Sequence, residues 1–347
     1  FVSTAQQFPD SLIAYTPTRP CDPFVWCTDG IRIINPNTGE GIHIRPIDNS
    51  SQNNVYGESL RFSPDQRYLA YSTYGLMHIA EVATGKEVGI IQFYYPDSPY
   101  PSSVVYDWHP TLPLMAFRYQ SDFDSDIKPK YDLFVFDLLK QMWYPIVVDL
   151  EVILSGAQWS PDGTSLLITA TTVENREQWK YDIYSYNITT DTLKNLTNDP
   201  QKYYGSDWSE DSQQIIYTID NERNSQIITV DVNTGTQNVI LESSEVNFGG
   251  VSWVLDDTAI LFSHEPPSEG VDYESYLLDL ASGEITQVLA VPPYFIGYDL
   301  SPDKTALVYL ASPEGAKNVC IVSLITFEET CLEGEKAHHI AYPAWGG

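Results

Sequence analysis

The sequence has few basic residues and no long hydrophobic run. Only 18 Lys and Arg stand against 47 Asp and Glu, so the formal net charge is −29. A surface of this sign repels phosphate backbones and anionic lipids, which argues against nucleic-acid binding and membrane-surface roles. No apolar run approaches the ~18–20 residues of a membrane-spanning helix, so no membrane span is expected. Divalent cations or basic proteins suit the charge better, although acidity can also serve only to keep a secreted protein soluble.

Local signatures of catalysis are also missing. The chain has no Gly-x-Ser-x-Gly nucleophile elbow and no Gly-rich phosphate loop. Its six histidines show no His-x-x-x-His or Cys/His spacing, which argues against a zinc site. A catalytic set assembled from distant segments leaves no such signature, so a hydrolase or lyase stays an alternative.

Cysteine is scarce, and its four copies form two close pairs, Cys21/Cys27 and Cys320/Cys331. Four cysteines allow three disulfide connectivities, and near-neighbour pairing is favoured because Cys320 and Cys331 flank a strand–turn–strand pattern. Disulfides form in oxidising compartments, so this pairing predicts a secreted or periplasmic protein. Four reduced thiols in a cytosolic protein are the alternative. The chain begins with Phe1, which a removed signal segment or a trimmed chain would each explain.

What the chain has in abundance is a repeated turn. Trp159-Ser-Pro-Asp-Gly163 is typical of a strand end followed by a tight turn, because Pro presets φ, Asp bonds its own backbone and Gly tolerates positive φ. Related turns begin at Phe62, Trp108, Trp208, Trp253 and Leu300. By this numbering, successive copies lie 46, 51, 49, 45 and 47 residues apart. A period of ~40–50 residues that holds four short strands predicts the blades of a β-propeller.

The two ends of the chain should complete one blade. Residues 10–16 resemble the second strand of a blade but follow no first strand, whereas residues 339–345 resemble a first strand and then stop. Trp345 lies 45 residues after Leu300, on the same period. The C-terminal segment is therefore expected to pair with the N-terminal blade, which closes a ring and removes exposed sheet edges. This predicts an all-β protein of seven four-stranded blades, with six blades as the alternative.

The whole chain, residues 1–347, is expected to form this single propeller domain. Within each blade the strands are called a to d in chain order. The Ser-Pro-Asp turn joins strands a and b, and Thr-Gly turns join strands c and d. The predicted boundaries are 10–46 plus 337–345 for blade 1, 57–96 for blade 2, 103–149 for blade 3, 154–198 for blade 4, 204–242 for blade 5, 248–290 for blade 6 and 294–334 for blade 7.

The Trp-Ser-Pro-Asp-Gly turn with its aliphatic strand resembles the WD40-like (PD40) repeat of TolB-like propellers. That family includes the propeller halves of prolyl-oligopeptidase-like and dipeptidyl-peptidase-like enzymes. The resemblance covers nearly the whole chain and implies the propeller fold, while the motif says little about function. The chain departs from the pattern at Trp108-His-Pro110, Trp253-Val-Leu-Asp256 and Trp345. The sequence also shows neither the small α/β domain of TolB nor the α/β-hydrolase domain of the peptidases.

The b–c loops and d–a connections of a propeller emerge on one face, and here they hold nearly all the irregular sequence. Function concentrates on variable loops held by a rigid frame, so a partner is expected on that face. Aromatic residues in these connections are candidates for a binding rim, with ordinary packing as the alternative. They are Tyr94, Tyr95, Tyr100, Tyr203, Tyr204, Tyr294 and Phe295. His339, in the last d–a connection, is a further binding candidate near the expected mouth of the central channel.

One b–c loop is strongly acidic. Asp122, Asp124 and Asp126 stand at alternate positions, and hard oxygen ligands at that spacing suit Ca²⁺. Ile127 stands where a calcium loop needs Gly, and no Glu follows at the twelfth position, so a plain solvated loop is the competing interpretation. Calcium is the one cofactor that the sequence suggests.

These observations favour a non-catalytic, extracytoplasmic propeller that binds or scaffolds a protein partner. A carbohydrate-binding propeller that uses the same aromatics, with or without calcium, is the second hypothesis. A hydrolase or lyase with its site in the central channel is the third.

Overall fold

The computed structural model describes residues 11–16, 18–22, 25–28, 30–44, 56–73, 76–92, 106–122, 130–146, 152–172, 181–198, 202–220, 224–265, 273–291, 298–311, 317–337 and 343–346. Within these ranges the strands form seven four-stranded antiparallel sheets and one two-stranded sheet, which confirms the predicted all-β fold and seven blades over six. No helix in the same ranges is long and apolar enough to span a membrane. The chain divides into two compact units, Phe1–Ser103 with Tyr294–Gly347 and Val104–Pro293.

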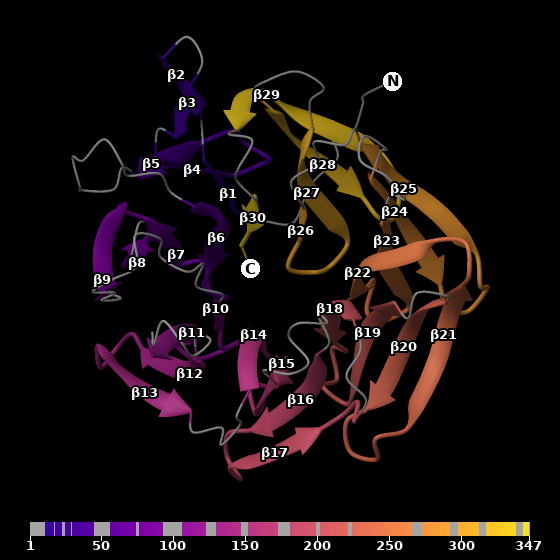
Figure 1. Cartoon of the computed structure of the whole chain (residues 1–347). Coiled ribbons are helices and arrows are strands. Elements are labelled where there is room, and N and C mark those ends of the chain that lie inside the picture. Colours follow the sequence, from indigo (N-terminus) through magenta and orange to yellow (C-terminus); the bar gives the residue numbers. More distant parts are fainter. Residues whose placement is uncertain are drawn as a thin grey trace. The chain divides into compact units, whose positions relative to one another are not determined.

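The first unit contains blades 7, 1 and 2 (Figure 1). Its strands are β1 Ile13–Tyr15, β2 Thr18–Asp22, β3 Val25–Thr28, β4 Ile31–Ile34, β5 Gly41–Ile44, β6 Tyr56–Phe62, β7 Tyr68–Thr73, β8 Leu76–Glu81, β9 Lys86–Gln92, β26 Tyr298–Leu300, β27 Ala306–Ala311, β28 Lys317–Ser323, β29 Glu329–Ala337 and β30 Ala344–Trp345. Blade 1 has the strand order β30-β1-β4-β5, so the last strand of the chain lies beside the first. Blades 2 and 7 are meanders of consecutive strands, β6–β9 and β26–β29, and β2 and β3 form a separate hairpin.

The predicted pairing of the two chain ends is confirmed. Trp345 lies opposite Ile13 in the antiparallel register of β30 and β1. The backbone N–H of Gly346 donates to the carbonyl oxygen of Leu12 at 2.8 Å. The indole N–H of Trp345 donates to Ser11 Oγ at 2.5 Å. The end of the chain therefore supplies the strand that the first blade lacks.

The second unit contains blades 3 to 6 (Figure 1). Its strands are β10 Tyr106–Trp108, β11 Leu114–Asp122, β12 Lys130–Asp137, β13 Met142–Ile146, β14 Val152–Trp159, β15 Ser165–Thr172, β16 Asp182–Asn187, β17 Thr192–Asn195, β18 Lys202–Trp208, β19 Gln214–Asp220, β20 Ser225–Asp231, β21 Gln237–Ser243, β22 Asn247–Val254, β23 Ala259–Glu265, β24 Tyr273–Asp279 and β25 Ile285–Val291. Each blade is a meander of four consecutive strands: β10–β13, β14–β17, β18–β21 and β22–β25.

One position in strand b builds much of the core. It lies two residues after the residue that pairs with the Trp, Phe or Leu of strand a. Its occupants are Tyr15, Tyr71, Phe117, Ile168, Tyr217, Phe262 and Tyr309. All seven side chains are at most 2% exposed, and burying one such side chain contributes ~1.5–3 kcal/mol. The clusters join consecutive blades; Trp159 of blade 4, for example, packs with Val135 of blade 3.

The a–b turns are held by a serine and an aspartate. In blade 4, Ser160 Oγ donates to Asp162 Oδ1 at 2.6 Å and accepts the backbone N–H of Ser165 at 3.0 Å. Asp162 Oδ1 also accepts the backbone N–H of Thr164 at 2.9 Å. The same serine–aspartate bond recurs in blades 2, 5 and 7, between Ser63 and Asp65, Ser209 and Asp211, and Ser301 and Asp303. These aspartates cap turns.

A second set of aspartates, one residue before the strand-a Trp or Leu, links consecutive blades. Asp207 Oδ2 accepts the backbone N–H of Trp253 in blade 6 at 3.0 Å. Its Oδ1 accepts an amide N–H of Gln158 in blade 4 at 2.9 Å. Equivalent bonds of 2.7 Å join Asp107 to Trp159 and Asp299 to Trp345. Sequence reasoning missed this role, although Asp precedes the apolar residue in three of the repeats.

Candidate functional site

Most of the predicted binding residues lie outside the described residues. These are Tyr94, Tyr95, Tyr100, Tyr294, Phe295 and His339, together with Asp124 and Asp126 of the acidic loop. Asp122 ends β11 and Tyr204 lies in β18, but only their backbones are described. The aromatic rim, the His339 site and the calcium site therefore stay predictions.

Tyr203, in β18, is the predicted rim residue whose side chain the structure describes. Its ring is half-buried and meets Tyr217 of β19 edge-on, with the ring centroids 5.4 Å apart. The side chain packs against a buried cluster shared by blades 4 and 5. This contact gives Tyr203 a packing role, and its binding role stays a prediction.

Cys320 and Cys331 form the predicted disulfide, between β28 and β29. The two residues face each other in the sheet register, so the bond cross-links neighbouring strands of blade 7. Glu329 lies close to both sulfur atoms, but disulfide sulfurs are not thiolates, so this group is poorly suited to a metal ion. Cys21 and Cys27 lie on the paired strands β2 and β3, and their bond stays a prediction.

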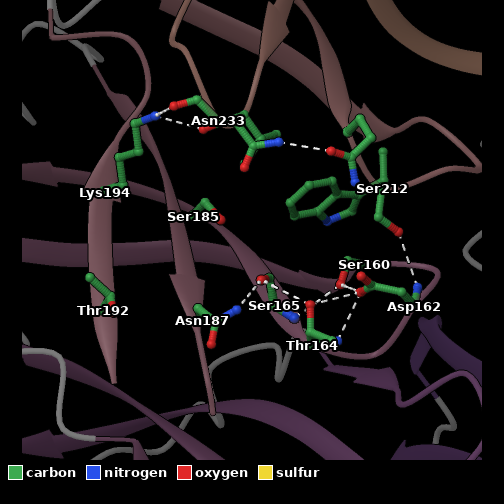
Figure 2. A pocket seen from close by; sticks show the side chains of 13 residues that line it. Ser160, Asp162, Thr164, Ser165, Ser185, Asn187, Thr192, Lys194, Ser212 and Asn233 are labelled. Carbon is green, nitrogen blue, oxygen red and sulfur yellow. Dashed lines mark hydrogen bonds between the residues drawn. The ribbon is translucent and has the colours of Figure 1, made fainter. Parts of the chain in front are cut away.

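A polar cleft of about 290 Å³ lies between blades 4 and 5 (Figure 2). Strands c and d and the a–b turn of blade 4 form one wall, and turns of blade 5 form the other. The lining residues are Ser160, Asp162, Thr164, Ser165, Ser185, Asn187, Thr192, Lys194, Trp208, Ser212, Gln213, Val232 and Asn233. The cleft therefore lies at the a–b and c–d turns, whereas sequence reasoning looked to the b–c loops and d–a connections.

Hydrogen bonds between the two blades hold the walls of the cleft. The backbone N–H of Asp162 donates to Ser212 Oγ at 3.1 Å. Lys194 Nζ donates to the carbonyl oxygens of Val232 and Asn233 at 2.6 and 2.7 Å (Figure 2). The cleft is thus preformed, which lowers the entropy cost of filling it.

The cleft contains one carboxylate and one ammonium group. Burial acts to raise the pKa of Asp162, but hydrogen bonds from Ser160 and Thr164 outweigh it and hold the pKa below its ordinary value. Asp162 is therefore ionised at neutral pH, and Lys194 carries the opposite charge. The lining is polar but close to neutral overall.

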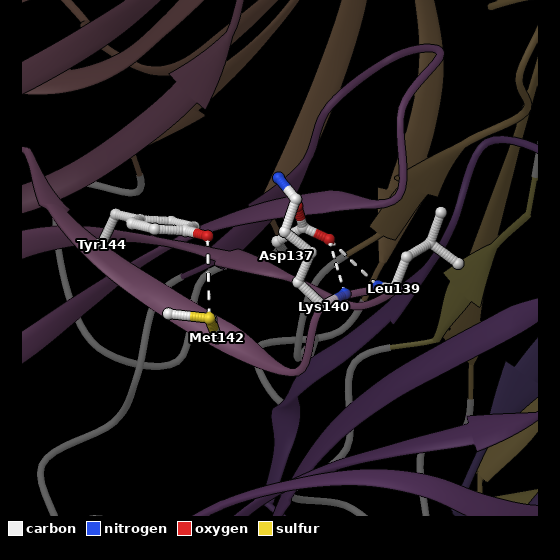
Figure 3. A network of polar contacts seen from close by, with 5 residues as sticks. All are labelled: Asp137, Leu139, Lys140, Met142 and Tyr144. Carbon is white, nitrogen blue, oxygen red and sulfur yellow. Dashed lines mark hydrogen bonds and ion pairs between the residues drawn. The ribbon is translucent and has the colours of Figure 1, made fainter.

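The c–d turn and strand d of blade 3 carry exposed apolar side chains. Figure 3 shows three of them, Leu139, Met142 and Tyr144, beside Asp137 and Lys140. This blade-3 patch consists of Leu139, Met142, Trp143 and Tyr144, with exposed fractions of 75%, 52%, 50% and 40%. Along strand β13, Met142 and Tyr144 point to one face of the sheet and Trp143 to the other. Trp143 leans edge-on against Phe134, with ring centroids 4.8 Å apart. Lys140 Nζ lies 5.9 Å from the Tyr144 ring centroid and pairs with the Asp137 carboxylate at 2.9 Å. The patch is therefore apolar, with one internally balanced ion pair at its base.

Blade 6 holds a cluster of acid–base groups that sequence reasoning did not identify. The Tyr276 hydroxyl donates to Glu274 Oε2 at 2.6 Å, and His264 Nδ1 lies 3.9 Å from the same oxygen. Burial lowers the pKa of His264, whereas burial and the bond to Glu274 raise the pKa of Tyr276 to about 12. The groups meet because β23 and β24 pair His264 opposite Glu274, not because of any sequence motif. Such a set can move a proton, and by itself it defines no reaction.

No protein-family model matches the chain, and no curated protein matches its sequence. Solved structures match its fold. TolB from Acinetobacter baumannii has 15% sequence identity and a TM-score of 0.54, over 96% of this chain and 82% of TolB. A prolyl endopeptidase has 14% identity and a TM-score of 0.66, over 93% of this chain and 50% of the enzyme. The β-propeller domain of Cps50 (Swd1) from Myceliophteria thermophila has 9% identity and a TM-score of 0.55, over 82% of this chain and 90% of that domain.

At these identities the likeness establishes the fold alone. The chain is a β-propeller of seven four-stranded blades, similar in fold to TolB and prolyl-endopeptidase propellers, as the repeated Trp-Ser-Pro-Asp-Gly turn predicts. It spans about half the length of the prolyl endopeptidase that it matches. The activity of that enzyme therefore does not transfer with the fold.

Proposed function

We propose that this propeller is an extracytoplasmic, non-catalytic module that binds or scaffolds a protein partner. The observation that carries the proposal is the blade-3 patch, whose four large side chains are 40% to 75% exposed. The fold does not demand them, because the equivalent c–d turn of blade 5 forms with the polar sequence Asn233-Thr-Gly235. Large exposed apolar side chains that packing does not require are typical of interaction surfaces.

The composition of the blade-3 patch suits a protein interface. Trp, Tyr and Met are enriched in such interfaces. Trp143 offers a large apolar area from a paired strand, so little conformational entropy is lost when a partner covers it. Because Lys140 is paired with Asp137, a partner can cover the patch without burying an unpaired charge.

The partner that fits this chain is a basic protein. A net charge of −29 attracts a positively charged surface and speeds the encounter. The apolar patch then supplies the short-range contact that holds the complex. The association rate should therefore fall as salt is added, whereas the dissociation rate should depend on the patch.

An extracytoplasmic location is supported by the Cys320–Cys331 disulfide, because such bonds persist in oxidising compartments. Alkylation of intact cells followed by mass spectrometry tests the location. Both cysteines should be recovered protected from the reagent. Their recovery as alkylated free thiols would contradict it.

The test of binding compares Trp143→Ala with a matched control, Val239→Ala, whose side chain is 52% exposed on strand d of blade 5. Proteins that the wild-type chain captures from the extracytoplasmic fraction of its source are identified and purified, and their affinities are measured by titration calorimetry. Truncating a central interface Trp costs ~2 kcal/mol or more, so Trp143→Ala should weaken binding by about 30-fold. The control should bind as wild type does. Equal affinities for wild type and Trp143→Ala would overturn the proposal.

Carbohydrate binding and channel catalysis stay alternatives. Glycan binding that Tyr94→Ala or Tyr204→Ala abolishes would favour the first. Turnover that is lost in His339→Ala would favour the second.

A further inference from the structure

Strand c of blade 4 carries a serine at a position where five of the other six blades bury an aliphatic side chain. Ser185 lies two residues before Asn187, whose side chain caps the c–d turn. In five other blades the equivalent residue is Ile33, Ile79, Val135, Leu277 or Ile321, all buried. In blade 5 it is Thr229. Ser185 thus replaces core volume with a short side chain and a hydroxyl group.

The Ser185 hydroxyl lies in the cleft between blades 4 and 5 (Figure 2). The residue is only 6% exposed, but its hydroxyl is not among the buried side-chain atoms without a partner in the described part of the chain, and it is open to the cleft. A hydroxyl that faces a polar cleft is completed by water or by a ligand. Ser185 therefore points to an occupant of the cleft that can hydrogen-bond with it.

The groups around Ser185 offer both donors and acceptors. Asp162 uses one carboxylate oxygen to cap its own turn, and the other accepts no hydrogen bond from the described part of the chain. Lys194 has three N–H donors and uses two of them for the carbonyl oxygens of Val232 and Asn233. The third N–H can therefore bond to a ligand. Thr192 lies on the same wall. Hydroxyl groups match such a lining, because each can donate and accept.

Charge and size narrow the ligand class further. One carboxylate balances one ammonium group, which disfavours both a phosphate and a free cation. The cleft volume of about 290 Å³ lies just below the ~300–1,000 Å³ range of small-molecule sites. A compound the size of one sugar ring fits these limits better than an oligosaccharide.

We propose that the cleft between blades 4 and 5 binds a neutral polyhydroxylated small molecule of about the size of one hexose. Ser185, Asp162 and Lys194 supply its principal hydrogen bonds. The site is separate from the blade-3 patch, so it is independent of the proposed protein partner.

The test replaces Ser185 with the kind of residue that other blades use. Ser185→Val should fold, because Val135 occupies the equivalent position in blade 3. Thr229→Val is the matched control, since it makes the same exchange in blade 5 away from the cleft lining. Binding of glucose, galactose, mannose and inositol is measured by saturation-transfer NMR and calorimetry, with inorganic phosphate as the anionic comparison. At least one neutral compound should bind wild type and Thr229→Val, and Ser185→Val should weaken it at least about tenfold without lowering the unfolding midpoint.

Three results would overturn the proposal. The first is that none of the four neutral compounds binds the wild-type chain at millimolar concentrations. The second is that phosphate binds and they do not. The third is that folded Ser185→Val binds as wild type does; should that variant unfold, Ser185→Ala, which removes the same hydroxyl without adding volume, takes its place, and undiminished binding there has the same meaning.

Discussion

Blades 3 and 5 belong to the same compact unit and share their inter-blade bonds, but they present different surfaces to solvent. In each, the aspartate before the strand-a tryptophan accepts a backbone N–H of the next blade. Asp107 bonds to Trp159 at 2.7 Å, and Asp207 bonds to Trp253 at 3.0 Å. The connection between blades therefore does not depend on what either blade carries on its turns.

The c–d turns of the two blades have the same backbone and opposite surfaces. Asp137 in blade 3 and Asp231 in blade 5 each accept turn N–H groups, and the left-handed position holds Gln141 (φ 53°) or Gly235 (φ 76°). In blade 3 the exposed Leu139 lies between the capping Asp137 and the left-handed Gln141. The fold needs the cap and the left-handed residue, and the residues between them are free to serve a partner.

The a–b turns of the two blades are closed by different chemistry. In blade 5 the Ser209 hydroxyl accepts the backbone N–H of Gln214 at 2.9 Å. In blade 3 the Nδ1 atom of His109 accepts the backbone N–H groups of Thr111 and Leu112, each at 3.1 Å. An imidazole can accept these bonds only while it is unprotonated, so blade 3 gains a dependence on pH that blade 5 lacks.

The largest loss of stability is expected from Asp207→Ala, because it removes the inter-blade hydrogen bonds that blades 3 and 5 have in common. This buried carboxylate accepts hydrogen bonds from Trp208, Trp253 and Gln158. Each buried donor left unpaired costs ~1–3 kcal/mol, so the free energy of unfolding should fall by about 3–5 kcal/mol. Urea denaturation followed by tryptophan fluorescence measures it. Asp211→Ala removes an exposed turn aspartate of the same blade and should lower the free energy of unfolding by less than half as much. Equal losses in the two variants would mean that the hydrogen bonds between blades add no more stability than a turn cap does.

A matched pair of glycine substitutions should give the next largest difference. Gly163 and Gly235 both have positive φ, 72° and 76°. A Cβ atom at Gly163 would lie 2.5 Å from the His109 ring, whereas one at Gly235 would meet nothing within 4 Å. Gly235→Ala should therefore cost only the left-handed strain of ~1 kcal/mol, and Gly163→Ala about 2–4 kcal/mol because His109 must also move. Urea midpoints measure both, and equal costs would show that the His109 contact does not support the turn.

A smaller effect should appear as a pH dependence. Burial lowers the pKa of His109, and its bond to the Gly163 backbone and the charge of Asp162 offset this only in part. The unfolded chain, with an ordinary histidine pKa of ~6.5, therefore binds the proton more readily than the folded chain. The stability that neutral His109 contributes is complete above that pH and is lost as the pH falls below it.

Exchanging the turn chemistry isolates this pH effect. The double variant His109→Ser with Thr111→Asp gives blade 3 the Ser-Pro-Asp turn of blade 4. Both proteins lose stability between neutral and mildly acidic pH. The loss in free energy of unfolding should be about 1 kcal/mol smaller for the double variant, because two backbone hydrogen bonds no longer depend on an imidazole. His264, whose pKa burial also lowers, is present in both proteins and cancels in the comparison. Parallel pH curves would show that His109 stays neutral or unimportant throughout.

The parts of the fold that local chemistry repeats could be predicted from the sequence. Ser160 and Asp162 bond within one turn, so their pattern predicts that turn. The same period placed Trp345 beside the first strand. The bond that Asp207 accepts from the Trp253 backbone was harder to predict, because it joins residues 46 apart and its one sequence signal is the Asp that precedes the apolar residue in three repeats.

The candidate sites were harder to predict, for a physical reason. Ser185 becomes conspicuous only when the seven c strands are compared in sheet register, where the equivalent residue is aliphatic in five of the other six blades. The blade-3 patch had a visible signal, since Met142-Trp-Tyr144 follows the one c–d turn rich in Leu. The sequence instead predicts a binding rim of aromatics beside prolines, such as Tyr94 and Tyr100, in connections outside the described residues.

The smallest effect on stability is expected from giving blade 3 the surface of blade 5. The four changes are Leu139→Asn, Met142→Thr, Trp143→Gln and Tyr144→Asn, which copy the residues at the equivalent positions of blade 5. Exposed substitutions usually change stability by less than ~0.5 kcal/mol. Trp143 gives up ring contacts with Phe134 and Phe117, and Tyr144 gives up its exposed contact with Lys140, so the summed loss should stay near 1 kcal/mol.

Partner binding should respond in the opposite way, because the exchanged residues are the contact surface itself. The quadruple variant should unfold within about 1 kcal/mol of wild type and lose measurable affinity for the partner that wild type captures. A stability loss as large as that of Asp207→Ala would mean that the residues of the blade-3 patch are needed to stabilise the fold. The difference between the surfaces of blades 3 and 5 would then give no evidence for binding. Retained stability with lost affinity is the combination that only an interaction surface produces.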